Sequence, residues 1–406
     1  MPERHRQWNT AKRQTGFRQN FTHSINYHLQ TLYIMKINWV TLLLILGVLV
    51  ILNNNCSKDD VAEPLLEPIG YAAIAAGTNH SLALKKDGTL WTWGLNNFGQ
   101  LGDGTIVDKH IPIQIGSGFS DIAAGGGHSL ALKTDGTLWA WGYNGYGGLG
   151  DATTVDKNKP IQIGTGYADI AGGGAHSLAV KTDGTLWSWG YNDSGQLGDG
   201  TIVDKHIPIQ IGSGFSGIAA GGGHSLALKT DGTLLVWGLN HVGQLGDGTT
   251  IYKNIQVQIG SDYKVIDAGY NHSLAIKTDG TLWAWGFNGS GGLGNGTTSQ
   301  KTTPVQIGSS FSSIAGGNAH SLALKIDGTL WAWGTNAGGE LGDGTAVDKS
   351  IPVQIGSGFA AIAAGGSHSL ALKTDGTLWA WGRNFNGRLG DGTLIDKNTP
   401  IKIGPE

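Results

Sequence analysis

A period of 48 residues, repeated seven times, is the feature that most constrains how this chain can fold. The motif His-Ser-Leu recurs at this fixed spacing, and each copy is followed by Asp-Gly and by a stretch containing tryptophan. The seven motif histidines are His80, His128, His176, His224, His272, His320 and His368. If the unit begins at Tyr71, seven units fill residues 71–406 with nothing left over. A fixed period of this length is typical of a solenoid, a propeller or an array of small units.

Each unit has the pattern of short strands joined by tight turns, with no helical periodicity. In the second unit, GGGHSLALK and TLWAWG alternate apolar with small or polar residues, which is strand periodicity. Between them, Asp135-Gly136 predicts a hairpin with a type I′ turn. PIQIG predicts a further strand, whose proline suits a sheet edge, and we expect a fourth strand in between. The expected fold class is therefore all-β, a seven-bladed β-propeller built from seven 48-residue repeats.

The two ends of the repeat array favour a closed ring over an open solenoid. An open array usually needs atypical capping repeats, whereas WTWG at 91–94 and WAWG at 379–382 show that the first and last units are ordinary. We expect the final PIKIG, 400–404, to complete a blade beside the strands of the first unit and so to close the ring. Pro64-Leu65 falls in register with that strand one period earlier, so we expect it either to compete for the same place or to extend the seam.

The repeated sequence resembles the regulator of chromosome condensation repeat. GGGHSLAL, DGTLWAWG, N-x-x-GQLGDGT and P-I-Q-I carry this resemblance, which covers all of residues 71–406. It implies a seven-bladed propeller, in agreement with the period, but a fold does not by itself imply a function. Similar bacterial propellers include a secreted β-lactamase inhibitor that acts by surface contact. The eukaryotic family member is a guanine-nucleotide exchange factor that uses an insertion, and every unit here has 48 residues without one.

The repeated polar residues favour structure over chemistry. Neighbours on a strand point to opposite faces, so His128 and Ser129 do not form a nucleophile and base pair; we expect the histidine to bond backbone between blades. No phosphate-loop pattern follows the glycines, and paired aspartates such as Asp103 and Asp108 are better explained as turn formers than as calcium ligands. We expect no cofactor, no metal and no enzymatic activity. Tryptophans two apart are expected to pack between blades.

If the repeated positions build the scaffold, the positions that differ are the candidates for function. The units differ most in the loop after the tryptophan strand, from LNNFGQ at 95–100 to RNFNGR at 383–388. Seven equivalent loops lie on one rim of a ring, and aromatic and arginine residues are frequent interface anchors. The predicted binding residues of this rim are Phe98, Tyr143, Tyr146, Tyr191, His241, Phe287, Glu340, Arg383, Phe385 and Arg388. Unselected drift is the alternative, because residues 99–138 and 195–234 differ only at Asp121 and Gly217, which indicates recent duplication.

The N-terminal part indicates export. The apolar run at 37–52 follows Lys36, which is typical of a secretory signal, and Met35 is a natural start, so residues 1–34 are read as an over-called upstream extension. Residues 35–55 are then the signal peptide and 56–70 an acylated Cys56 with a linker, as in a bacterial lipoprotein. Asn53 and Asn55 depart from that pattern, which leaves an uncleaved anchor or an ordinary secreted protein open.

Charge and composition complete the functional prediction. Residues 1–55 carry six basic residues and one acidic residue, which leaves 21 basic and 29 acidic residues beyond them, a net charge of −8. That balance disfavours nucleic acid, whose phosphates need clustered lysine and arginine. We therefore expect a monomeric, non-catalytic binding or scaffold module that recognises a protein or glycan in the cell envelope through loops on one rim. The membrane is reached only through the N-terminal lipid or signal anchor, as in an outer-membrane lipoprotein, with secretion as the alternative. The alternative function is nucleotide exchange on a small GTPase.

Overall fold

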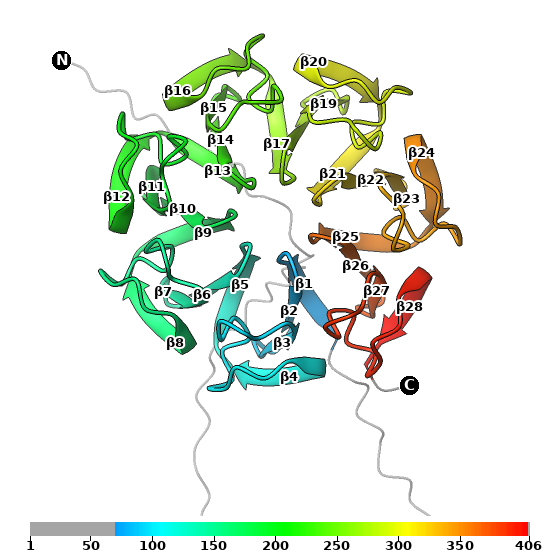
Figure 1. The fold of residues 1–406 in the computed structure, drawn as a ribbon, viewed down its shortest axis with the longest axis horizontal. Coiled ribbons are helices and arrows are strands. Elements are labelled where there is room, and N and C mark those ends of the chain that lie inside the picture. The colour runs from blue at the N-terminus through cyan, green and yellow to red at the C-terminus, as the bar shows by residue number, and fades with distance from the viewer. Residues whose placement is uncertain (1–69, 405–406) are drawn as a thin grey trace, which may run out of the picture. The chain divides into compact units, whose positions relative to one another are not determined.

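A computed structural model of the chain describes residues 70–404, which form a ring of seven four-stranded antiparallel sheets (Figure 1). Each sheet is one blade, and its strands follow chain order from the centre outward. Blades begin at Tyr71, Phe119 and so on around the ring, so the 48-residue units coincide with blades and the expected fold is confirmed. The expectations for residues 1–69, Cys56 and Pro64-Leu65 included, lie outside the described residues. Within residues 70–404, no helix is long and apolar enough to cross a membrane.

The four strand positions recur in every blade. The innermost strands are β1 (Tyr71–Ala76), β5 (Phe119–Ala124), β9 (Tyr167–Gly172), β13 (Phe215–Ala220), β17 (Tyr263–Ala268), β21 (Phe311–Gly316) and β25 (Phe359–Ala364). The second strands are β2 (His80–Lys85), β6 (His128–Lys133), β10 (His176–Lys181), β14 (His224–Lys229), β18 (His272–Lys277), β22 (His320–Lys325) and β26 (His368–Lys373). The third strands are β3 (Leu90–Gly94), β7 (Leu138–Gly142), β11 (Thr185–Gly190), β15 (Leu234–Gly238), β19 (Leu282–Gly286), β23 (Leu330–Gly334) and β27 (Leu378–Gly382). The outermost strands are β4 (Lys109–Gly116), β8 (Lys157–Gly164), β12 (Lys205–Ser213), β16 (Lys253–Gly260), β20 (Lys301–Gly308), β24 (Lys349–Gly356) and β28 (Lys397–Ile403).

The Asp-Gly hairpin joins the second and third strands, but its predicted turn type is wrong. Lys133 N–H donates to Thr137 O, and Gly136 N–H donates to Lys133 O, so three residues form the loop. Gly136 has a φ of 76°, whereas Asp135 is not among the residues with positive φ. This is a type I turn followed by a left-handed glycine. The aspartate stays in ordinary backbone space because its carboxylate accepts the N–H and hydroxyl of Thr137.

The apolar core lies between blades rather than within them. One cluster joins Leu82 and Leu90 of the first blade to Phe119, Ile122 and Trp141 of the second, and six further clusters repeat this arrangement around the ring. The second tryptophan of each pair is wholly buried, and the first is partly buried against the same cluster. The expected packing of tryptophans between blades is therefore confirmed.

The ring does not close by strand exchange, and that expectation is corrected. β28, which contains the final PIKI residues, pairs with β27 and completes the seventh blade, not the first. The seam between the seventh and first blades instead closes by packing, because Trp93 lies in one cluster with Leu370 and Leu378. Backbone bonds from Tyr71 N–H to Gly376 O and from Gly366 N–H to Gly77 O add to it. Seven complete blades therefore meet side by side.

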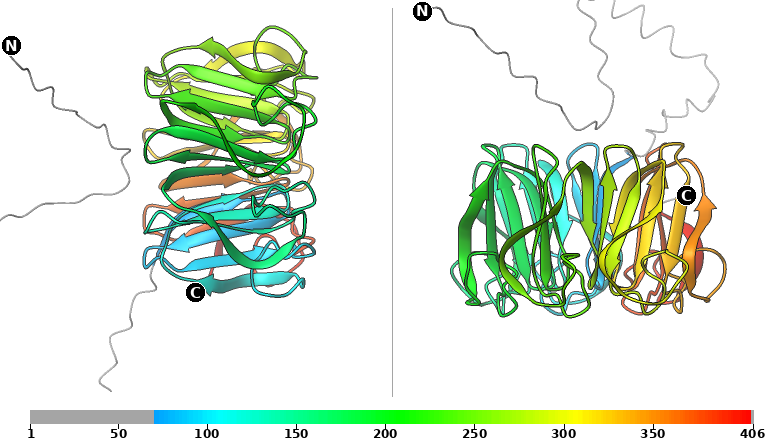
Figure 2. Two further views of the ribbon diagram at one scale, coloured as in Figure 1. Left: turned by 90° about the vertical axis from the view of Figure 1, so that its left-hand side faces the viewer. Right: turned by 90° about the horizontal axis from the view of Figure 1, so that it is seen from above.

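The strand directions give the ring two different faces (Figure 2). The start of β2 pairs with the end of β3, and the end of β3 pairs with the start of β4. The turns between first and second strands and the long loops between third and fourth strands therefore lie on the same face, here called the loop face. The Asp-Gly turns and the connections between blades lie on the opposite face. All ten predicted rim residues belong to loop-face segments.

Candidate functional site

The repeated histidine and serine form a continuous ring of hydrogen bonds between blades. His80 Nε2 lies 2.9 Å from the Oγ of Ser129 in the next blade, and the same contact recurs until His368 reaches Ser81 across the seam at 2.8 Å. The Ser129 hydroxyl donates to Gln100 O at 2.8 Å, so the histidine Nε2–H must be the donor to Ser129. The expected hydrogen bond from the histidine to the backbone is therefore wrong. The histidine donates to the serine of the next blade, and that serine donates to a backbone carbonyl. Both side chains are wholly buried, which leaves them no access to a substrate.

The paired aspartates hold the loop-face loops in shape. The buried Asn96 side chain accepts Leu101 N–H and donates to Asp103 Oδ1, Thr105 and the carbonyl of Val107. Asp108 Oδ1 accepts Asn96 N–H. The asparagine side-chain bonds, here called the asparagine frame, recur in all seven loops, with Asn295 replacing the first aspartate in the fifth. The bond to the second aspartate is present in five of them. Among residues 70–404, no three His, Cys, Asp or Glu residues are placed to hold a metal ion.

Four of the predicted rim residues form one row of aromatic rings across the first three blades, here called the aromatic row. The Phe98 and Tyr143 ring centroids are 4.9 Å apart, Tyr143 and Tyr146 are 6.1 Å apart, and Tyr146 and Tyr191 are 4.4 Å apart. Tyr146 is 40% exposed and the other three are partly buried. The Tyr191 hydroxyl donates to Asp193, which raises the pKa of Tyr191. The row is therefore a contiguous surface contributed by three separate loops.

A second group of predicted residues, here called the seam group, lies in the loops of the sixth and seventh blades. It consists of Glu340, Arg383, Phe385 and Arg388. Arg383 Nε lies 3.4 Å from Glu340 Oε1, and the Arg388 guanidinium lies 4.0 Å from the ring centre of Phe385. Phe385 is 55% exposed, but Glu340 and Arg388 are only 2% and 1% exposed. These two occupy the place of the buried Gln100, beneath the rim, so their predicted role as surface contacts is corrected. Burial lowers the pKa of Arg388 to about 10, which leaves it charged at neutral pH.

The remaining two predicted residues lie apart from both groups. His241 is exposed in the fourth blade, where its Nδ1 is 3.5 Å from Gln244 Nε2. Phe287 is partly buried in the fifth blade. The structure therefore divides the ten predicted residues into the aromatic row, the seam group and these two separate positions.

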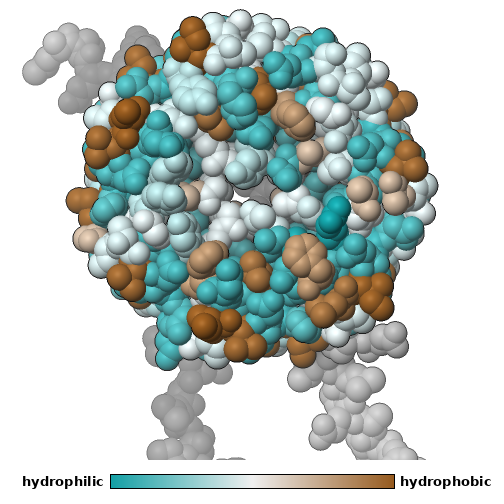
Figure 3. Space-filling view, in the orientation of Figure 1, coloured by the Kyte–Doolittle hydropathy of each residue, from teal (hydrophilic) through white to brown (hydrophobic). Residues whose placement is uncertain are grey.

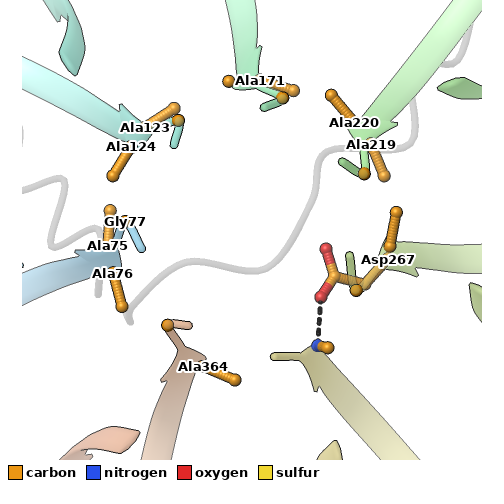
Figure 4. Close-up of a pocket in the computed structure, with 18 of the residues that line it drawn as sticks. Ala75, Ala76, Gly77, Ala123, Ala124, Ala171, Ala219, Ala220, Asp267 and Ala364 are labelled. Atoms are coloured by element: carbon orange, nitrogen blue, oxygen red, sulfur yellow. Dashed lines mark hydrogen bonds between the residues drawn. The ribbon is translucent and has the colours of Figure 1, made fainter. Parts of the chain in front are cut away.

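The sequence reading missed a third group, at the mouth of the central channel on the loop face. The channel encloses a cavity of about 590 Å³ lined almost entirely by alanine, glycine and isoleucine. Four lining residues break this pattern: Thr78, Asp267, Tyr270 and Asn318. Asp267 extends into the channel from β17 (Figure 4). The signal was present in the sequence, because Asp267 stands where the other six units have alanine.

Comparison with known proteins agrees with the repeat. The RCC1-like domain matches residues 116–406, and the regulator of chromosome condensation (RCC1) repeat matches residues 87–132 and 71–100. The chain belongs to the RCC1-like family.

Two solved structures share the fold of this chain. Prp20p from Saccharomyces cerevisiae is 24% identical, with a TM-score of 0.72 over 80% of this chain and 88% of that chain. Human WBSCR16 is 23% identical, with a TM-score of 0.71 over 78% of this chain and 94% of that chain. At these identities the likeness shows the RCC1-like fold alone. The Arabidopsis thaliana ultraviolet-B receptor UVR8 is 45% identical over 42 residues, a match that spans a tenth of each chain.

Proposed function

We propose that this propeller is a non-catalytic recognition module that binds a protein partner in the cell envelope through the loop face, with the aromatic row as its centre. The observation that carries this proposal is the contiguity of the four rings, which come from three loops with different sequences. Each loop is held by the buried asparagine frame, so little conformational freedom is lost on binding. Tyrosine and phenylalanine are enriched at protein interfaces, and tyrosine is frequent among the residues that contribute most of the binding energy.

The geometry of the row favours a protein over a glycan. The three successive ring pairs are inclined at 57°, 70° and 44°, so the rings pack on one another and present no single flat face for stacking sugars. Other exposed apolar residues include Ile106 and Val107. On the face seen in Figure 3, hydrophobic residues are spread around the circumference. Because they surround the ring without gathering, they do not mark one docking place. The aromatic row is the localised feature.

The test compares capture from envelope extract by the full chain and by two variants. One variant carries Phe98→Ser, Tyr143→Ser, Tyr146→Ser and Tyr191→Ser, and the matched control carries Leu239→Ser and Val242→Ser in the equivalent loop of the fourth blade. We expect the wild type and the control to capture the same partner and the row variant to lose it, with circular dichroism unchanged. Equal capture by all three contradicts the proposal. A captured species that survives protease but not periodate is a glycan and overturns the choice of a protein.

Nucleotide exchange is the alternative function, and it is tested directly. Prp20p, which shares the fold, has been characterised for its binding to Gsp1p and histones. In this chain all seven loops between third and fourth strands have the same length within residues 70–404, so none projects as an added element. We expect the full chain to leave release of a fluorescent nucleotide from a small GTPase unchanged. Catalytic acceleration of that release contradicts the non-catalytic proposal.

We also propose that the chain is exported and anchored by acylation of Cys56. The support is sequence alone: an apolar run at 37–52 behind Lys36, and then a lone cysteine before an acidic stretch. Labelling of bacterial cells with a radioactive fatty acid is expected to mark the wild-type chain and not Cys56→Ala. Equal labelling of both overturns the assignment of the cysteine, and a soluble, unlabelled wild type overturns the anchor.

A further inference from the structure

Three residues give one sector of the central channel a chemistry that the rest lacks. Asp267 of β17 stands at the position held in the other blades by Ala75, Ala123, Ala171, Ala219, Ala315 and Ala363. Tyr270, in the turn after β17, replaces the glycine found at this position in four of the other blades. Asn318 replaces the same glycine in the next blade. All three line one cavity, so neighbouring blades together place a carboxylate, a phenol ring and an amide at its mouth.

The Asp267 carboxyl group faces the channel with no protein cation among the described lining residues. Its Oδ2 accepts Gly316 N–H of the next blade at 2.7 Å, and the side chain extends into the open channel (Figure 4). Of the described residues that line the cavity, none is lysine, arginine or histidine, and Tyr270 is the other titratable side chain. Burial raises the pKa of Asp267 to about 7. A cation at this carboxylate therefore relieves an unfavourable charge state.

Tyr270 is held in place at the mouth by both neighbouring blades. Its N–H donates to Gly317 O at 3.0 Å, and its carbonyl accepts Gly222 N–H at 3.0 Å. The ring lies over Gly222, where a Cβ would come within 2.9 Å of a ring carbon. Although its backbone is fixed, the residue is 51% exposed. The ring covers the fourth-blade side of the opening, at Gly222, whereas the Asp267 carboxylate lies on the sixth-blade side, at Gly316.

We propose that this channel binds a small linear organic amine, with its ammonium group at Asp267 and its hydrocarbon chain along the alanine and glycine lining. The small side chains leave room for a chain of methylene groups and offer it apolar contact. A divalent metal fits poorly, because calcium and magnesium require several oxygen ligands and only one carboxylate is present. The site is distinct from the aromatic row, so the two proposals succeed or fail separately.

The test is calorimetric titration of the full chain with n-hexylamine, beside n-hexanol as the uncharged chain of matched length. Asp267→Asn removes the charge, and Asp267→Ala restores the residue of the other six blades, so both variants are expected to fold. Asp193→Asn in the third-blade loop is the matched control for loss of one carboxylate. We expect saturable binding by the wild type and the control, with affinity at least about tenfold weaker for both Asp267 variants and for n-hexanol. We also expect about tenfold weaker binding at pH 6 than at pH 8, because Asp267 must be ionised.

Three results overturn the proposal. The first is the absence of saturable binding at millimolar n-hexylamine. The second is equal affinity for n-hexylamine and n-hexanol, which would mean that the channel contacts the hydrocarbon chain and does not recognise the ammonium group. The third is unchanged affinity in Asp267→Asn when circular dichroism shows a folded protein. Loss of partner capture by the aromatic-row variant has no bearing on this test, and that variant is expected to bind n-hexylamine normally.

Discussion

Mild acid is expected to unfold this propeller, because its blades are joined by neutral histidines. Each of the seven histidines is wholly buried and uses Nε2–H to reach a serine, while its Nδ1 has no hydrogen-bond partner. A proton added to Nδ1 would therefore be a buried charge with no acceptor. Burial accordingly lowers the pKa of His80, His176, His224 and His320 to about 3 and that of His128 and His272 to about 4, and holds that of His368 well below its usual value.

The sign and size of the effect follow from these values. In the unfolded chain a histidine has a pKa of about 6.5. Between that value and the lower folded pKa, the unfolded state binds a proton and the folded state does not. The stability from each histidine is present above pH 6.5 and is lost as the pH falls toward the folded pKa. At about pH 5 the loss is about 2 kcal/mol per histidine and about 14 kcal/mol for seven, which is of the order of a whole domain's stability. Asp267 opposes this trend, since its raised pKa adds stability as the pH falls through about 7, but it is one group against seven.

The assay is denaturant unfolding followed by tryptophan fluorescence at a series of pH values between about 7.5 and 5. We expect the free energy of unfolding to fall with a slope approaching seven protons between about pH 6 and pH 5. The matched variant is His224→Gln, whose neutral amide can still donate to Ser273 and which should lower the slope by one proton. A flat profile down to pH 5, or an identical slope in His224→Gln, would refute the reasoning.

Three further predictions concern the scaffold. Trp141→Ala should destabilise the ring by about 3–5 kcal/mol and Trp139→Ala by clearly less, since only Trp141 is wholly buried; the free energy of unfolding in denaturant checks both, and equal losses would contradict the packing. Asn96→Ala should cost about 1–3 kcal/mol, because it strips Leu101 N–H of its acceptor, and limited proteolysis should then cut the first loop selectively. A circular permutant that joins residue 406 to residue 71 and begins at Phe119 should fold with an unchanged melting temperature. Failure of that permutant to fold would show that the seam depends on chain order.

Much of the fold was predictable because the repeat fixes local structure in every copy. The period set the number of blades, the alternation around Leu130 set the strand faces, and the paired tryptophans set the packing between blades. The turn at Asp135-Gly136 was misjudged because a type I turn with a left-handed glycine uses the same two residues as type I′. Closure was misjudged because β28 had a partner nearer in sequence than the first blade.

The candidate site was only partly predictable, for a different reason. Which residues differ between units can be read from the sequence, but which of them reach the surface depends on how each loop folds back. Gln100, Glu340 and Arg388 share one position beneath the loops, and nothing in their identity shows that it is covered. The hydrogen-bond partner of His80 could not be predicted either. Ser129 lies 49 residues away in the sequence and contacts the imidazole only when the two blades pack together.

The histidine-to-serine contact has a consequence for how such a chain can change. In every blade the histidine bonds the serine of the next blade, and the serine bonds the histidine of the preceding blade. All seven junctions therefore use the same hydrogen bond, and this bond does not restrict which blade follows which. Copying one unit over another by recombination therefore preserves the histidine-to-serine bond at all seven junctions while it changes the residues in which the units differ. Residues 99–138 and 195–234, which differ at one position, indicate recent duplication within the array. New recognition surfaces can arise here by reshuffling whole units, at no cost to the frame.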